Sequence, residues 1–243
     1  MKLLRSCLLL FTLTGLFAAA SAGAQIQLGE AVKQLGLGKS ATLPESKVAS
    51  GLKEALRVGA DNAVKYTGRK DGYFANAAIK ILMPKNLRPI EKGLRAVGYG
   101  PKVDEFILSM NRAAEQAAPE ARLIFRDAIL SMTFEDARKI LHGSDTAATE
   151  YFQAHTTSQL SAAFQPVVKQ AMRENGVTRQ YEDLIGKYES LPFMQGPTFD
   201  INEYVVSQAL NGLFYMLGEE EKKIRKNPAA RVTSLLKEIF AKR

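Results

Sequence analysis

The polar residues best suited to binding chemistry fall on one predicted helix, at residues 102–118. Asn111, Arg112 and Glu115 are three or four positions apart, so an amide, a guanidinium and a carboxylate lie close together on the helix surface. A guanidinium such as that of Arg112 can bind a carboxylate or phosphate through two parallel hydrogen bonds. Polar groups beside an apolar stripe are equally typical of buried partners that fix helix register. An anion-binding site and a structural cluster are both open hypotheses.

Two further candidates for ligand binding lie elsewhere in the chain. Thr149 follows an expected helix start, and its hydroxyl can donate to a ligand, although a threonine inside a helix usually bonds to its own backbone. Arg225, like Arg112, is a candidate for the mouth of an apolar cleft. It belongs to the run 219–226, where glutamates precede Lys or Arg by three or four positions, as on a solvated helix face.

Recognised catalytic and metal-binding motifs are missing from the sequence. The two histidines, His142 and His155, are thirteen residues apart, and no HExxH, GxSxG, P-loop or GxGxxG pattern occurs. His142 suits the last turn of a helix, and His155 is expected toward an apolar face. We therefore expect no metal and no cofactor, and the sequence favours a protein that is not an enzyme.

The N-terminus has the three parts of a secretory signal peptide. Lys2 and Arg5 precede an apolar run from Leu8 to Ala20, and Ala22-Gly23-Ala24 supplies small residues for cleavage. The run is shorter than the roughly twenty residues of a membrane span. We predict a leader at 1–24, cleavage between Ala24 and Gln25, no transmembrane segment in the mature chain, and a periplasmic or secreted protein.

The positive charge is spread along the chain. The formal net charge is +8 for 243 residues, and it falls to about +6 without Lys2 and Arg5. Basic residues are mixed with acidic ones, and no basic run alternates with aromatics as a single-strand groove requires. We expect no nucleic-acid partner. A solvated basic surface is the simple interpretation, and an anionic lipid or envelope polymer is the functional alternative.

Helix start and stop signals recur from Pro44 onward, and they predict an all-α fold. We expect residues 25–43 to be a flexible N-terminal segment and residues 44–243 to be one helical domain, a bundle of about nine helices. Thr133 with Asp136, and Asp200 with Glu203, resemble capping boxes. The apolar helix that begins near Ile201 is the candidate for the centre.

Three local features are expected in addition to the bundle as a whole. The apolar run Ile79–Met83 predicts one short strand, which can form a hairpin with residues 193–199. Thr156 or Thr157 is expected to start a new helix, with a kink at Pro166. A last amphipathic helix is expected from Asn227.

Ordered segments along the chain together resemble an exported bacterial family, the domain of unknown function 4197 (DUF4197). The segments are 71–73 (DGY), 79–84 (IKILMP), 110–115 (MNRAAE), 132–137 (MTFEDA), 140–143 (ILHG), 147–152 (AATEYF), 209–214 (ALNGLF) and 220–228 (EEKKIRKNP). The resemblance covers nearly all of the chain after the leader. It implies one domain, bacterial origin and export, and it implies no activity or binding residue.

These observations favour a non-enzymatic periplasmic protein that binds a lipid or another small amphipathic or anionic ligand between its helices. One alternative is a structural or protein-interaction module of the cell envelope, with an envelope protein as partner. Another is a hydrolase or lyase acting on envelope polymers, which needs two carboxyls facing each other across a cleft.

Overall fold

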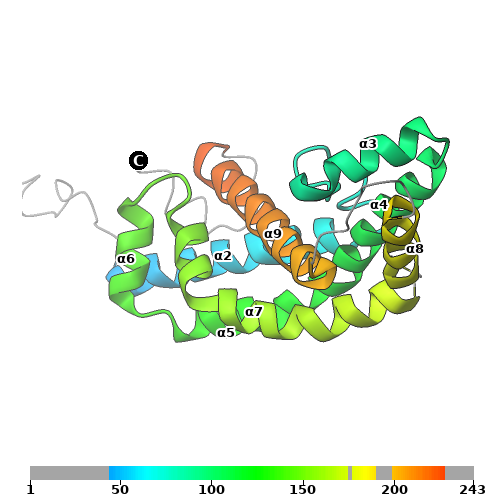
Figure 1. Ribbon diagram of the computed structural model, residues 1–243. Coiled ribbons are helices and arrows are strands. Elements are labelled where there is room, and N and C mark those ends of the chain that lie inside the picture. Colours follow the sequence, from blue (N-terminus) through cyan, green and yellow to red (C-terminus); the bar gives the residue numbers. More distant parts are fainter. Residues whose placement is uncertain (1–43, 175–176, 190–198, 228–243) are drawn as a thin grey trace, which may run out of the picture. The chain divides into compact units, whose positions relative to one another are not determined.

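The computed structural model describes residues 44–174, 177–189 and 199–227, all of them in one unit that begins at Pro44. The predicted leader, the segment 25–43 and the predicted last helix lie outside the described residues. The protein is all-α, as predicted, with no strand among the described residues (Figure 1). In chain order the helices are α2 (Glu45–Gly68), the 3-10 turn η1 (Lys85–Leu87), α3 (Arg88–Ala96), α4 (Gly100–Ala117), the 3-10 turn η2 (Ala118–Glu120), α5 (Ala121–Ser131), α6 (Phe134–His142), α7 (Ala147–Glu174), α8 (Val177–Glu189) and α9 (Ile201–Lys226).

One long helix replaces two that were expected. α7 continues through Thr156 and Thr157, whose hydroxyls donate to backbone carbonyls four residues back instead of capping a new helix. The described residues therefore hold fewer α-helices than the nine or so predicted. Pro166 lies inside α7, and a kink there stays a prediction.

Two predicted helix starts are confirmed. At α6, the Asp136 amide donates to the Thr133 hydroxyl at 3.1 Å, and the Thr133 amide donates back to the Asp136 carboxylate at 3.0 Å. At α9, the Asp200 carboxylate accepts hydrogen bonds from the amides of Asn202 and Glu203. These side chains satisfy amides that the first turn of a helix leaves without partners.

α9 is a central helix, as its apolar sequence predicts. It packs along both α2 and α7, and Figure 1 shows it crossing α2. An aromatic cluster joins it to two other helices: the ring of Phe125 in α5 lies 5.0 Å from that of Phe152 in α7 and 6.2 Å from that of Phe214 in α9. Burying each such ring contributes about 1.5–3 kcal/mol, so the three rings stabilise the packing of α5, α7 and α9 against one another.

The predicted strand at Ile79–Met83 is wrong. A strand needs a neighbouring backbone, but here the side-chain amide of Asn111 takes that place. It accepts from the Ile81 amide at 2.8 Å and donates to the Ile81 carbonyl at 2.8 Å. With both groups satisfied by a side chain, the segment needs no second strand. Part of the predicted partner, at 193–198, lies outside the described residues.

Tyr73, which is fully buried, connects the chain between α2 and η1 to α9. Its hydroxyl donates to the Ala209 carbonyl at 2.6 Å. Burial, and then the charge of Glu115, raises the pKa of this phenol, so it stays a neutral donor. Gly212 makes the close approach feasible, because a Cβ there would lie only 2.5 Å from Tyr73 Cε1.

We predict that Gly212→Ala lowers the free energy of unfolding by about 1–3 kcal/mol, since the Tyr73 ring cannot move without losing its hydrogen bond. Gly93→Ala is the control, because a Cβ at Gly93 in α3 would meet nothing within 4 Å. That change should stabilise the protein by about 0.5–1 kcal/mol. Urea unfolding followed by circular dichroism measures both, and a Gly212→Ala protein as stable as the wild type would contradict the packing described.

Candidate functional site

The structure brings Asn111, Arg112 and Glu115 together, and it gives each a partner inside the protein. Glu115 Oε1 accepts from the amides of Tyr73 and Phe74, both at 3.1 Å. Its other oxygen accepts from Arg112 Nη1 at 2.6 Å. We call Asp71, Asn111, Arg112 and Glu115 the α4 cluster.

Arg112 is the member of the α4 cluster that was expected to bind an anion. Its second guanidinium nitrogen, Nη2, donates to Asp71 Oδ1 at 2.7 Å. Burial lowers the pKa of Arg112, but the hydrogen bonds and charges of Glu115 and Asp71 outweigh it and raise the pKa overall. Two carboxylates therefore bind the guanidinium of Arg112, whose side chain is only 23% exposed. The arrangement supports the structural hypothesis for the cluster.

The structure also brings Thr149 and Arg225 together, because both bind Glu221. The sequence did not single out Glu221 as a binding group. The Glu221 carboxylate accepts from the Ala148 amide at 3.0 Å and from the Thr149 amide and hydroxyl, both at 2.9 Å. It also accepts from Arg225 Nη2 at 2.8 Å. We call Thr149, Glu221 and Arg225 the α9 cluster.

The α9 cluster satisfies the ends of two other helices. Glu221 holds amides in the first turn of α7, and Arg225 donates to the Ile140 carbonyl at the end of α6, at 2.8 Å. A carboxylate and a cation so placed also match the dipoles of those helix ends. The side chain of Arg225 is only 6% exposed, and the apolar pocket that it lines holds about 20 Å³, far below the volume of a small-molecule site.

The predicted solvated face at residues 219–226 is wrong in part. Glu220 and Glu221 are buried, although they pair with Lys223 and Arg225 at the predicted spacing. Glu220 also accepts from Asn62 of α2 at 2.9 Å. Charge alternation alone did not distinguish a solvated pair from a buried one, because both use the same helix spacing.

The histidines have local partners. His155 is exposed, not turned toward the core as expected; its ring stacks on Tyr151 at 4.1 Å, and its Nδ1 lies 2.8 Å from the Tyr151 carbonyl. His142 lies in the last turn of α6, as predicted. Within the described part of the chain, no group of His, Cys, Asp and Glu is arranged to hold a metal ion.

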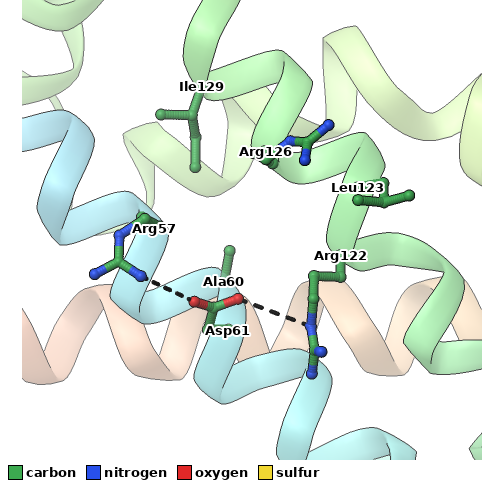
Figure 2. Close-up of a pocket in the computed structure, with 7 residues that line it drawn as sticks. All are labelled: Arg57, Ala60, Asp61, Arg122, Leu123, Arg126 and Ile129. Atoms are coloured by element: carbon green, nitrogen blue, oxygen red, sulfur yellow. Dashed lines mark hydrogen bonds and ion pairs between the residues drawn. The ribbon is translucent and has the colours of Figure 1, made fainter.

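A groove of about 220 Å³ lies between α2 and α5 (Figure 2). Arginines surround it, but each already has a carboxylate neighbour. Arg57 pairs with Glu54 and Asp61 at 2.8 and 3.3 Å, Arg122 lies 4.0 Å from Asp61, and Arg126 pairs with Asp127 at 3.0 Å. An anion entering here would have to compete with those carboxylates.

A second groove, of about 410 Å³, lies where residues 80–88 meet the start of α9. We call it the basic groove. It is lined by Lys80, Leu82, Met83, Pro84, Lys85, Asn86, Arg88, Phe199, Tyr204 and Gln208. No carboxylate of the described residues lies within ion-pair distance of its three cations. Its volume is in the range of small-molecule sites, about 300–1,000 Å³, which the α2–α5 groove does not reach.

Tyr204 defines one wall of the basic groove. Its hydroxyl donates to the Leu82 carbonyl at 3.0 Å, which ties the 80–84 segment to α9. Burial raises the pKa of this phenol, and the positive charge of Arg88 works in the opposite direction. Lys80 Nζ lies 4.0 Å above the Phe74 ring, a cation–π contact that leaves the charge without a carboxylate.

Sequence reasoning missed the basic groove. One signal was present: four cations, Lys80, Lys85, Arg88 and Lys92, occur within thirteen residues that contain a single acid, Glu91. The overall mixture of charges hid this local excess. Tyr204 and Gln208 could not be assigned to the same site, because more than a hundred residues separate them from Lys80.

The fold and the α4 and α9 clusters define an all-α protein built around a central helix, with the basic groove at its surface. None of the described helices combines the length and apolarity needed to cross a membrane. The chain belongs to the family described as "Protein of unknown function (DUF4197)", whose model matches residues 42–241. No curated protein and no solved structure matches the chain.

We predict that Glu115→Ala lowers the free energy of unfolding by about 3–5 kcal/mol, because it leaves Arg112 Nη1 and two backbone amides without their acceptor. Glu115→Gln should cost less, since its amide oxygen can still accept from Tyr73 and Phe74. Glu105→Ala is the matched control: this exposed glutamate of α4 pairs only with Lys102, and its loss should cost about 0–1 kcal/mol. Chemical denaturation compares the three variants. If Glu115→Ala were as stable as the wild type, the structural hypothesis would be contradicted and the anion-binding hypothesis for the α4 cluster would be favoured.

Proposed function

We propose that the protein binds a small amphipathic anion, without catalysing a reaction on it, and that the basic groove is the binding site. The observation that carries the proposal is the absence of any ion-pair partner, among the described residues, for three cations around a groove of about 410 Å³. A ligand with a carboxylate or phosphate head would receive charge-assisted hydrogen bonds from Lys80, Lys85 or Arg88.

The remaining lining supports an apolar tail. Leu82 is 50% exposed, and Met83, Pro84 and Phe199 line the groove with it. Covering such side chains contributes about 25 cal/mol for each Å² of apolar surface removed from water. Gln208 and Asn86 add neutral hydrogen-bonding groups that can orient the head. Charge and apolar surface side by side match an amphipathic anion better than a sugar or a free phosphate.

The two alternatives have less support. An interaction module that uses residues 219–226 loses much of its docking surface, because Glu220, Glu221 and Arg225 are buried in contacts with other helices. A hydrolase needs two facing carboxyls, whereas the α2–α5 groove is lined by one carboxylate, Asp61, and the basic groove by none.

We predict that dodecyl phosphate binds to the purified protein and that Lys85→Glu/Arg88→Glu weakens this binding by about tenfold or more, since a hydrogen bond to a charged group contributes about 1.5–3 kcal/mol. Added salt should weaken binding to the wild type, because the groove cations Lys85 and Arg88 are exposed. Isothermal titration calorimetry measures each affinity. Dodecyltrimethylammonium, which has the same tail and the opposite charge, should bind far less.

Lys169→Glu/Arg173→Glu is the control variant for this titration. It makes the same change of charge on an exposed face of α7, away from the groove lining, and should leave the affinity unchanged. Equal affinities of the wild type and the Lys85→Glu/Arg88→Glu variant would refute the assignment of the site.

We further propose that the protein is exported and that its leader is removed after Ala24. The charged start, the apolar run and the small residues at 22–24 support this. Intact-mass analysis of protein from the bacterial periplasm should show a chain that begins at Gln25. Ala22→Lys/Ala24→Lys, which removes the small residues, should retain the leader. A cytoplasmic protein that keeps Met1 or Lys2 at its N-terminus would count against export.

A further inference from the structure

The outer face of η1 and α3 carries a row of cations. Lys85, Arg88 and Lys92 follow one another at positions i, i+3 and i+7, and all three are exposed. The buried residues of the same segment, Leu87 and Ile90, point the other way. Such a segment is amphipathic, with its apolar side in the core and its charges directed outward.

This row continues the basic groove beyond its lining. Lys92 does not line the groove, and no carboxylate of the described residues pairs with it. The one acid among residues 80–92, Glu91, is bound to Arg95 at 3.0 Å. We call Lys80, Lys85, Arg88 and Lys92, together with the exposed Leu82, the cationic edge. It is larger than a single head group needs, which indicates an extended anionic partner.

The apolar member of the cationic edge helps to identify that partner. Leu82, half exposed, lies between Lys80 and Lys85 in the chain and lines the same groove. A nucleic acid or an acidic polysaccharide would satisfy the cations and leave Leu82 in water. An anionic bilayer supplies phosphates at its surface and an apolar layer just beneath them. Charge complementarity and the exposed leucine therefore favour a lipid surface.

We propose that the cationic edge docks the protein on an anionic phospholipid bilayer, from which the basic groove takes its ligand. This inference rests on the proposed function, and it adds the source of the ligand. The docking is peripheral: basic residues near an anionic leaflet each strengthen binding by about fivefold, and the attraction extends over about one Debye length.

Vesicle sedimentation tests the docking. The purified protein should sediment with phosphatidylcholine vesicles that contain roughly one third phosphatidylglycerol, and not with pure phosphatidylcholine. Lys92→Glu should weaken sedimentation on the order of tenfold and leave the affinity for dodecyl phosphate unchanged, since Lys92 is outside the groove lining. Lys169→Glu, the same change on α7, should have little effect on either. If Lys92→Glu and Lys169→Glu reduced vesicle sedimentation equally, the assignment of docking to the cationic edge would be overturned.

Tryptophan fluorescence provides an independent measurement, because the chain contains no tryptophan. A Leu82→Trp reporter should shift to the blue with anionic vesicles, whereas a Lys169→Trp reporter should not. Binding of dodecyl phosphate without vesicle binding would overturn the docking and leave the proposed function standing. Vesicle binding without binding of dodecyl phosphate would overturn the proposed function and, with it, uptake of a ligand from the membrane.

Discussion

The need to satisfy one buried carboxylate, Glu115, organises the irregular part of this protein. Unpaired, it would destabilise the fold, because the cost of burying a charge is returned only by a full set of hydrogen bonds. Its bonds to the amides of Tyr73 and Phe74 and to Arg112 hold the chain after α2 against α4. This contact fixes the start of the segment between α2 and η1, whose later residues line the basic groove.

The segment 69–84 lines the groove without forming a helix or a strand, and side chains bind several of its backbone groups. Asn111 takes the amide and carbonyl of Ile81, and Tyr204 donates to the carbonyl of Leu82. Buried backbone groups almost always have partners, and here side chains from α4 and α9 provide them. These contacts hold the segment in place beside α9. The segment is not helical, and a groove remains between it and the start of α9.

Burial separates the charges that support the fold from those that remain for a ligand. Glu115, Glu221 and Arg225 each use their charge on groups of the protein, and a buried charge without such partners would be costly. Lys85 and Arg88 are exposed, so water solvates them at little cost in the absence of a ligand. The same residue types thus act in opposite ways, and exposure decides which.

The sequence by itself determined the helical class, the capping box at Thr133, the cap at Asp200 and the central place of α9, because these depend on spacing within one helix. It also grouped Asn111, Arg112 and Glu115 correctly. Only the tertiary structure decided what those residues contact, that Glu221 joins Thr149 to Arg225, and that Tyr204 meets Leu82. Apart from pairs within one helix, such as Glu221 and Arg225, the partners in these contacts are 30 to 122 residues apart. Helical periodicity carries no information at that separation, since the path of the chain between helices sets which faces meet.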